Sequence, residues 1–174
     1  MNKFARIKPI ASYDKVAYYS VCIDNNTTSL FDKFIKHHSQ QNKEKINLVL
    51  EWIKNIGNKY GAQNHLFRSE AFIADAAALP PAGKDKKPHY TEAGEKATNN
   101  LRLYCLRANE YIVFLFNGDL KTADKAQKCP NVKEHFLLAN QLTKVIDEAF
   151  KEGEIQWNDD LTLLIYSDDL KLYL

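Results

Sequence analysis

The hydrophobic positions of the first sixty residues predict one strand followed by two helices. Residues 16–24 (VAYYSVCID) are rich in β-branched and aromatic side chains and end in turn-forming residues, which is typical of a strand. Ser29 and Asp32 form a capping-box pattern, and the apolar residues after them recur at helical spacing to about residue 38. A second apolar stripe predicts a helix over residues 43–59.

Two β-rich runs in the middle of the chain predict a hairpin. Residues 101–107 (LRLYCLR) alternate, so Arg102 and Tyr104 are expected on one outward face of the strand. Residues 111–116 (YIVFLF) are continuously apolar, which favours a central strand covered on both faces. The Asn-Gly-Asp sequence at 117–119 is expected to bend the chain.

The remaining segments complete an α+β pattern. Residues 67–81 fit either a short helix or a pair of strands, and residues 82–100 predict a long, exposed, flexible loop. An amphipathic helix with a capping box at its start is predicted over residues 131–152, and residues 161–166 and 170–174 could pair as a terminal hairpin. Strands and helices do not alternate regularly. The prediction is therefore one domain, residues 1–174, with a mainly antiparallel sheet packed against the N-terminal helix pair and the long helix.

Composition and charge narrow the function classes. The chain has 24 basic and 22 acidic residues, a net charge of +2, which argues against a protein that coats nucleic acid but leaves room for a local basic site. The spacing of the three cysteines fits no zinc motif, and reduced thiols are expected. The N-terminus has no apolar signal stretch, and no run reaches membrane-spanning length, so a cytoplasmic protein without a membrane partner is expected. His37 and His38 have no evident third ligand, and neither a metal nor another cofactor is predicted.

The hairpin region resembles a known family. The sequences LRLYCLR and IVFLFNGDLKT, followed by a linker with lysines and a proline that enters a helix, are similar to the RelE/HigB branch of the toxins of bacterial toxin–antitoxin systems. The resemblance covers residues 67–150. Arg102 and Arg107 match the arginines of the family's first strand, Lys121 matches its lysine element, and Arg68 precedes the hairpin in a related position.

The resemblance implies a RelE-like fold and a toxin-type endoribonuclease. Such proteins cleave messenger RNA, often on the ribosome, and a cognate antitoxin neutralises them. The implied reaction is metal-independent attack of a ribose 2′-OH on the adjacent phosphate, which requires cations, a base and an acid. Arginine suits phosphate because its planar fork donates two hydrogen bonds. The implied catalytic residues are Arg68, Arg102, Lys121, His135 and Tyr104, and the implied RNA-binding residues are Arg107, Lys125 and Lys128.

Each of these residues also has a structural interpretation. His135, at the start of the long helix, is the histidine best placed to act as a base, but a helix-face histidine is also commonly a packing residue. Arg102 and Arg107 could pair with nearby acidic residues, and the lysines could belong to a solvated linker. The alternative function is a noncatalytic interaction protein of the same fold, of phage or plasmid origin.

Overall fold

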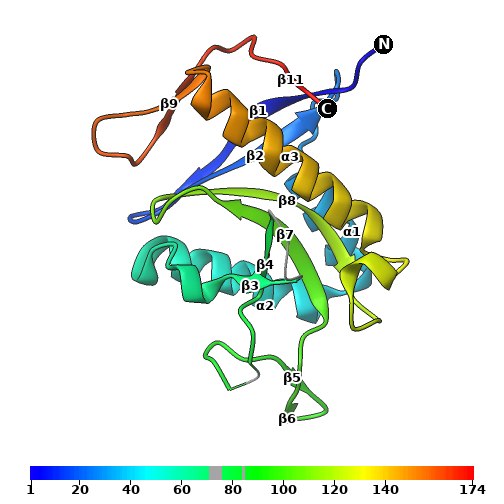
Figure 1. Cartoon of the computed structure of the whole chain (residues 1–174). Coiled ribbons are helices and arrows are strands. Elements are labelled where there is room, and N and C mark those ends of the chain that lie inside the picture. Colours follow the sequence, from blue (N-terminus) through cyan, green and yellow to red (C-terminus); the bar gives the residue numbers. More distant parts are fainter. Residues whose placement is uncertain (71–75, 84) are drawn as a thin grey trace.

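Three helices and a seven-stranded sheet form the body of the protein (Figure 1). The computed structural model describes residues 1–70, 76–83 and 85–174. The helices are α1 (Leu30–Gln41), α2 (Lys43–Asn55) and α3 (Lys133–Lys151). The strands of the large sheet are β1 (Phe4–Ser12), β2 (Ala17–Ile23), β3 (Arg68–Ser69), β4 (Ala77–Leu79), β7 (Leu101–Arg107), β8 (Ile112–Leu120) and β11 (Leu172–Tyr173). Their spatial order is β11-β1-β2-β8-β7-β4-β3.

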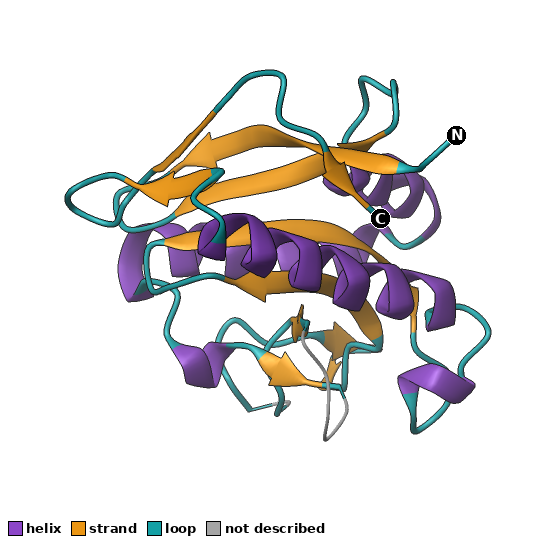
Figure 2. Ribbon diagram, turned by 45° about the horizontal axis from the view of Figure 1, so that its top comes forward, coloured by secondary structure: helices purple, strands orange, loops and turns teal. Residues whose placement is uncertain are grey.

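The fold is α+β, as the sequence predicts. The sheet is mixed but mainly antiparallel, since among the strand pairs of its described residues only β2 and β8 run parallel. Helices α1 and α2 cover one face of the sheet, and α3 crosses the other (Figure 2). This arrangement buries both faces of the central strands.

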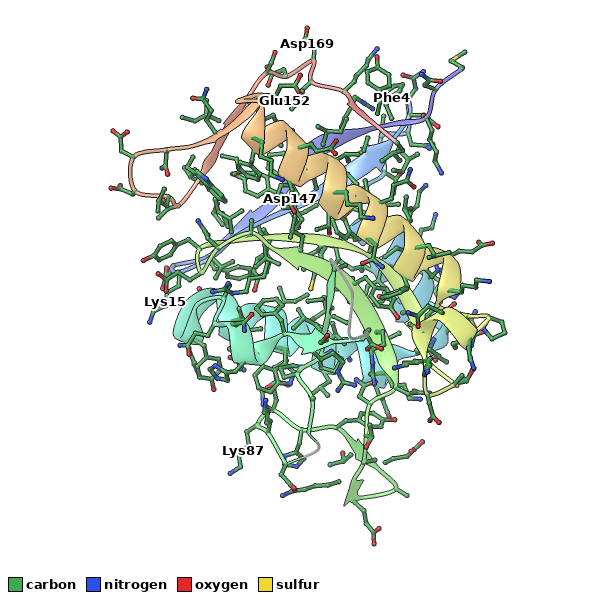
Figure 3. All side chains as sticks on the ribbon, in the orientation of Figure 1. Phe4, Lys15, Lys87, Asp147, Glu152 and Asp169 are labelled. Atoms are coloured by element: carbon green, nitrogen blue, oxygen red, sulfur yellow. The ribbon has the colours of Figure 1, made fainter. Side chains whose placement is uncertain are left out.

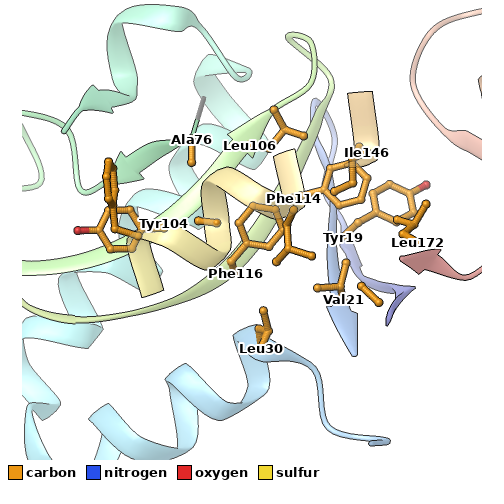
Figure 4. Packing of buried hydrophobic residues seen from close by; sticks show 14 of the residues in the cluster. Tyr19, Val21, Leu30, Ala76, Tyr104, Leu106, Phe114, Phe116, Ile146 and Leu172 are labelled. Carbon is orange, nitrogen blue, oxygen red and sulfur yellow. The ribbon is translucent and has the colours of Figure 1, made fainter. Parts of the chain in front are cut away.

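The two faces of β7 pack into two different hydrophobic clusters. Leu103 and Cys105 belong to the cluster under α1 and α2, whereas Tyr104 and Leu106 belong to the cluster under α3 (Figure 4). The alternation along β7 is therefore confirmed. The prediction that Arg102 and Tyr104 lie on an outward, exposed face is wrong. Helix α3 covers this face of the strand, and both residues are buried. Each large apolar side chain buried in this way contributes about 1.5–3 kcal/mol.

The three predicted helices are present, and one of their predicted caps is wrong. Ser29 caps α1 through the expected capping box with Asp32. Helix α2 continues into a π-helical turn over Ile56–Tyr60. Helix α3 has Val132 as its N-cap, without a side-chain cap. A backbone turn takes the place of the predicted Asn131 cap. After the 3-10 turn at Ala126–Lys128, the carbonyl of Cys129 accepts hydrogen bonds from the amides of Val132 and Lys133.

The strands formed by the two ends of the chain differ from the sequence prediction. Strand β1 was not predicted, and it is interrupted by a register shift between Pro9 and Ala11. The prediction that residues 161–166 and 170–174 pair as a terminal hairpin is wrong. Residues Leu164–Tyr166 (β10) pair instead with Ile155–Trp157 (β9), and β11 pairs with β1. Both ends of the chain thus join the same edge of the large sheet.

The segment between α2 and β7 is irregular. Strands β3 and β4 support the strand-pair interpretation of residues 67–81 at its two ends, while residues 71–75 lie outside the described residues. In the predicted loop 82–100, of which residue 84 is also outside the described set, Thr91–Glu92 (β5) and Glu95–Lys96 (β6) form a small hairpin. This loop carries Lys87 away from the body (Figure 3). Among the described residues, no helix has the length and apolar character needed to cross a membrane.

Strand β8 continues through residues 117–119, where the sequence predicts a bend. Leu103 pairs with Gly118 while Cys105 pairs with Leu115, so β8 has one extra residue at this point. This is a β-bulge, which bends a strand and changes the direction of the side chains beside it. Gly118 is required in the pairing, because a Cβ atom there would lie 1.7 Å from the carbonyl oxygen of Arg102. The strand therefore extends to Leu120, four residues beyond the predicted end at 116, and carries Asp119.

We expect the substitution Gly118→Ala to destabilise the protein by about 3 kcal/mol, the upper end of the usual cost of overpacking, because the added methyl group meets backbone that cannot rotate away. Urea unfolding followed by circular dichroism measures the loss. Glu95→Ala, at an exposed strand position, is the matched control and should change stability little. Equal stabilities of the two variants would show that β8 can shift to accept a side chain.

Candidate functional site

Two of the predicted phosphate-binding cations meet at a buried carboxylate. Arg102 donates from Nε to Oε1 of Glu70 over 2.7 Å, and Lys121 Nζ lies 2.5 Å from Oε2 of the same residue. The side chains of Glu70, Arg102 and Lys121 are only 1%, 7% and 14% exposed. The cations do converge, but Glu70 occupies the position that a phosphate would need.

Arg68 and Tyr104 belong to the same surroundings. Arg68 donates to the carbonyls of Pro80 and Pro81, and burial together with the positive charge of Arg102 lowers its pKa to about 10. Tyr104 packs against Phe136 of α3 with a ring-centroid distance of 5.6 Å. Burial raises the pKa of its hydroxyl, which has no hydrogen-bond partner among the described residues. A neutral, buried phenol is not placed to exchange protons with a bound RNA.

The other predicted RNA-binding residues lie apart from this group, which we call the Glu70 cluster (Arg68, Glu70, Arg102, Tyr104 and Lys121). Arg107 is at the opposite end of β7 and donates to the carbonyl of Ala62. Lys125 and Lys128 are exposed on the segment that leads into α3. The hairpin therefore does not present all its cations along one rim.

His135 lines a different, accessible cavity of about 290 Å³, which we call the histidine cavity. Its walls come from three elements: α1, the end of β8 and the first turn of α3. The lining residues are Lys33, His37, Asn117, Gly118, Asp119 and His135. Lys33 and His37 are exposed at its rim, and His135 is half-buried.

The elements hold these side chains by simple geometry. Lys33 and His37 are four residues apart on α1, so they project from the same face of the helix. The bulge in β8 precedes Gly118 and Asp119, which line the cavity beside α1 and the first turn of α3. His135 is in the first turn of α3, which packs on the opposite face of the sheet from α1. The cavity thus lies where the two helical layers meet beside the end of β8.

A second histidine of α1 lies under the wall of the cavity. His38 is fully buried, with Nε2 3.2 Å from the carbonyl oxygen of Gly118 and 3.9 Å from Oδ1 of Asp119. Its Nδ1 lies 2.9 Å from the side-chain nitrogen of Asn42. Burial lowers the pKa of His38, against the opposing effects of the Gly118 carbonyl and the Asp119 charge. Its imidazole is therefore neutral near pH 7.

His135 is also biased toward the neutral form. Burial lowers its pKa, while the negative charges of Asp119 and Glu134 act in the opposite direction. A neutral imidazole with an accessible lone pair can accept a proton, which is the property required of a general base.

Sequence patterns do not identify Lys33, Asp119 and Glu70 as residues of these sites. His37 and His38 are conspicuous, but their partner Asp119 is about eighty residues away and lies in a segment that the sequence assigns to a bend. Glu70 follows Arg68 in a segment whose secondary structure is ambiguous. No local pattern reveals either contact. The contact of Asp119 depends on the bulged pairing of β8 with β7, and that of Glu70 depends on the pairing of β3 with β4 and of β4 with β7.

Comparisons with protein-family models, with curated proteins and with solved structures found no match for this chain. The similarity to RelE/HigB toxins therefore remains a prediction from the quoted motifs.

We expect Glu70→Gln to reduce the free energy of unfolding by about 3 kcal/mol, because it leaves Arg102 and Lys121 buried without a counter-charge. The control is Glu92→Gln, which removes an exposed carboxylate from β5. Chemical denaturation of both variants measures the difference. A loss in Glu70→Gln no larger than that of the control would mean that the buried cations find other partners.

Proposed function

We propose that the protein is an endoribonuclease that cleaves RNA by metal-independent attack of a 2′-OH on the adjacent phosphate, and that the reaction takes place in the histidine cavity. The observation that carries this proposal is the presence of His37, His135 and Lys33 around one accessible cavity of about 290 Å³. These three side chains supply the base, the acid and the cation that the reaction requires.

Each of the three groups has a role that follows from its surroundings. His135, kept neutral by burial, accepts the proton of the 2′-OH as its oxygen attacks phosphorus. The ammonium group of Lys33, exposed at the rim, stabilises the negative charge that develops on the phosphoryl oxygens. His37 donates a proton to the 5′-oxygen as the bond between phosphorus and that oxygen breaks. The products are a 2′,3′-cyclic phosphate and a free 5′-OH.

The Glu70 cluster has a supporting role in this proposal. Its cations are buried and paired, so they do not contact the phosphate directly. Arg102 and Lys121 flank residues 103–120 of the hairpin, and Arg102 pairs in register with Asp119. The cluster therefore fixes the end of β8 from which Asp119 faces the cavity. Lys125 and Lys128, exposed just before α3, can contact neighbouring phosphates.

Two further expectations come with the resemblance to RelE/HigB toxins. The RNA would be messenger RNA, cleaved on the ribosome, and a cognate antitoxin would bind and neutralise the protein. The alternative, a noncatalytic interaction protein of the same fold, is favoured by one observation: the arginine and lysine that match the family motif are neutralised by Glu70.

The test is cleavage of a fluorescent RNA oligonucleotide by EDTA-treated protein, with and without ribosomes. We expect a product ending in a 2′,3′-cyclic phosphate, and no cleavage of the same oligonucleotide carrying 2′-deoxyribose. His135→Asn and His37→Asn should each slow the reaction by about 10²- to 10⁴-fold, the usual contribution of general acid–base catalysis. His65→Asn, which alters an exposed histidine outside the cavity, is the matched control and should retain full activity.

Two results would contradict the proposal. Wild-type protein that leaves RNA intact under both conditions would favour the noncatalytic alternative. Cleavage that survives in both cavity variants would place the chemistry elsewhere in the protein.

A further inference from the structure

We propose that His37, His38 and Asp119 form a binding site for a divalent transition-metal ion, with Zn²⁺ as the preferred ion. Each of the three residues offers one ligand atom, and these atoms all lie within 4.8 Å of one another. Among the described residues, this is the one group of three or more histidine, cysteine or acidic side chains whose ligand atoms lie close enough together to bind one ion. The site is binding chemistry that goes beyond the nuclease reaction.

The orientation of His38 prepares one ligand. Its Nε2 faces Asp119 at 3.9 Å, while Asn42 holds the opposite ring nitrogen over 2.9 Å. A metal-binding histidine usually donates its other ring N–H to a neighbouring acceptor, which fixes the ring. If the amide of Asn42 turns over, its oxygen accepts the N–H of Nδ1. Nε2, which lies 3.2 Å from the carbonyl oxygen of Gly118, then gives up any hydrogen bond to that carbonyl and presents its lone pair to the metal. The two orientations of an amide differ little in shape, so the flip of Asn42 itself needs no backbone movement.

The spacing of the ligand atoms requires only a small adjustment. Ligands that bind Zn²⁺ at about 2.0–2.1 Å in a tetrahedron lie about 3.3 Å from one another. The three atoms here are farther apart, at up to 4.8 Å. His37 is exposed and can rotate inward, and Asp119 is 30% exposed at the end of its strand. The buried His38 thus provides a fixed ligand toward which the other two side chains can close.

The types of ligand select the ion. Two imidazoles with one carboxylate suit Zn²⁺ and its neighbours among the transition metals, whereas Mg²⁺ and Ca²⁺ prefer a shell of oxygens. Three protein ligands leave a fourth position open. Because His37 and Asp119 both line the histidine cavity, we place that position on the side of the cavity. Water or a phosphate oxygen can fill that position.

Metal binding has a consequence for the nuclease, and this consequence rests on the proposed function. A metal ion bound to His37 uses the nitrogen lone pair that would carry the proton to the 5′-oxygen. Zn²⁺ would therefore inhibit RNA cleavage, and removal of the ion with a chelator would restore it.

Metal binding is tested first, without RNA. EDTA-dialysed full-length protein is titrated with Zn²⁺ by calorimetry and with Co²⁺ by visible spectroscopy. We expect one ion per chain and the d–d absorption of a low-coordinate Co²⁺ site. His37→Asn and Asp119→Asn should each weaken binding at least tenfold, whereas His65→Asn should bind as the wild type does. These variants avoid the buried His38, whose replacement can unfold the protein.

Several results would overturn the metal site. They are the absence of stoichiometric binding, unchanged affinity in His37→Asn and Asp119→Asn, or a sulfur-to-cobalt charge-transfer band, which would assign the ion to one of the three cysteines. RNA cleavage is then measured with the metal-free protein and after addition of one equivalent of Zn²⁺. Binding by a protein that does not cleave RNA supports the metal site and defeats only the nuclease proposal. Cleavage by a protein that does not bind metal supports the nuclease proposal and defeats only the metal site.

Discussion

The pairing of β8 with β2 on one side and β7 on the other is the constraint on which the rest of the structure depends. Residues Ile112–Phe116 are almost completely shielded from water, because helices cover both faces of the sheet. A strand in this position cannot shift its register without moving its apolar side chains to the wrong face. The extra residue before Gly118 is therefore a fixed feature, and it determines where Asn117 and Asp119 emerge from the sheet.

The end of β8 separates two polar groups with opposite properties. On the side of β7, Glu70 neutralises Arg102 and Lys121 in a buried network that solvent barely reaches. On the side of the helices, Lys33, His37 and His135 surround a cavity with an accessible rim. A buried ion network that has all its partners resists rearrangement, whereas polar side chains around a cavity can bind a ligand. This physical contrast is the reason the proposed chemistry is assigned to the second group, although the residues of the RelE/HigB-like motif belong to the first.

The elements that local rules govern could be predicted from the sequence. Ser29 and Asp32 form the cap that their spacing indicates, and the alternation in β7 correctly divides Leu103 from Tyr104. Local patterns do not predict the contacts that form the two sites, because those contacts join residues that are far apart in the sequence. Whether Tyr104 faces water or a helix depends on where α3 packs, thirty residues later. Asp119 approaches His38 only because a bulge lengthens β8, and the sequence Asn-Gly-Asp is more often a turn than the continuation of a strand.

The outermost long strand has a property that matters for behaviour at high concentration. Strand β11 pairs with β1 at Phe4 and Ala5, and the residues from Ile7 onward lie at the edge of the sheet. Pro9 has no N–H to offer, and the register shift beside it twists this edge. The side chain of Lys8 pairs with Asp32 of α1 over 3.0 Å, so a charged pair lies beside this strand. Such features discourage a second molecule from adding its own strand, so this border of the sheet resists edge-to-edge aggregation.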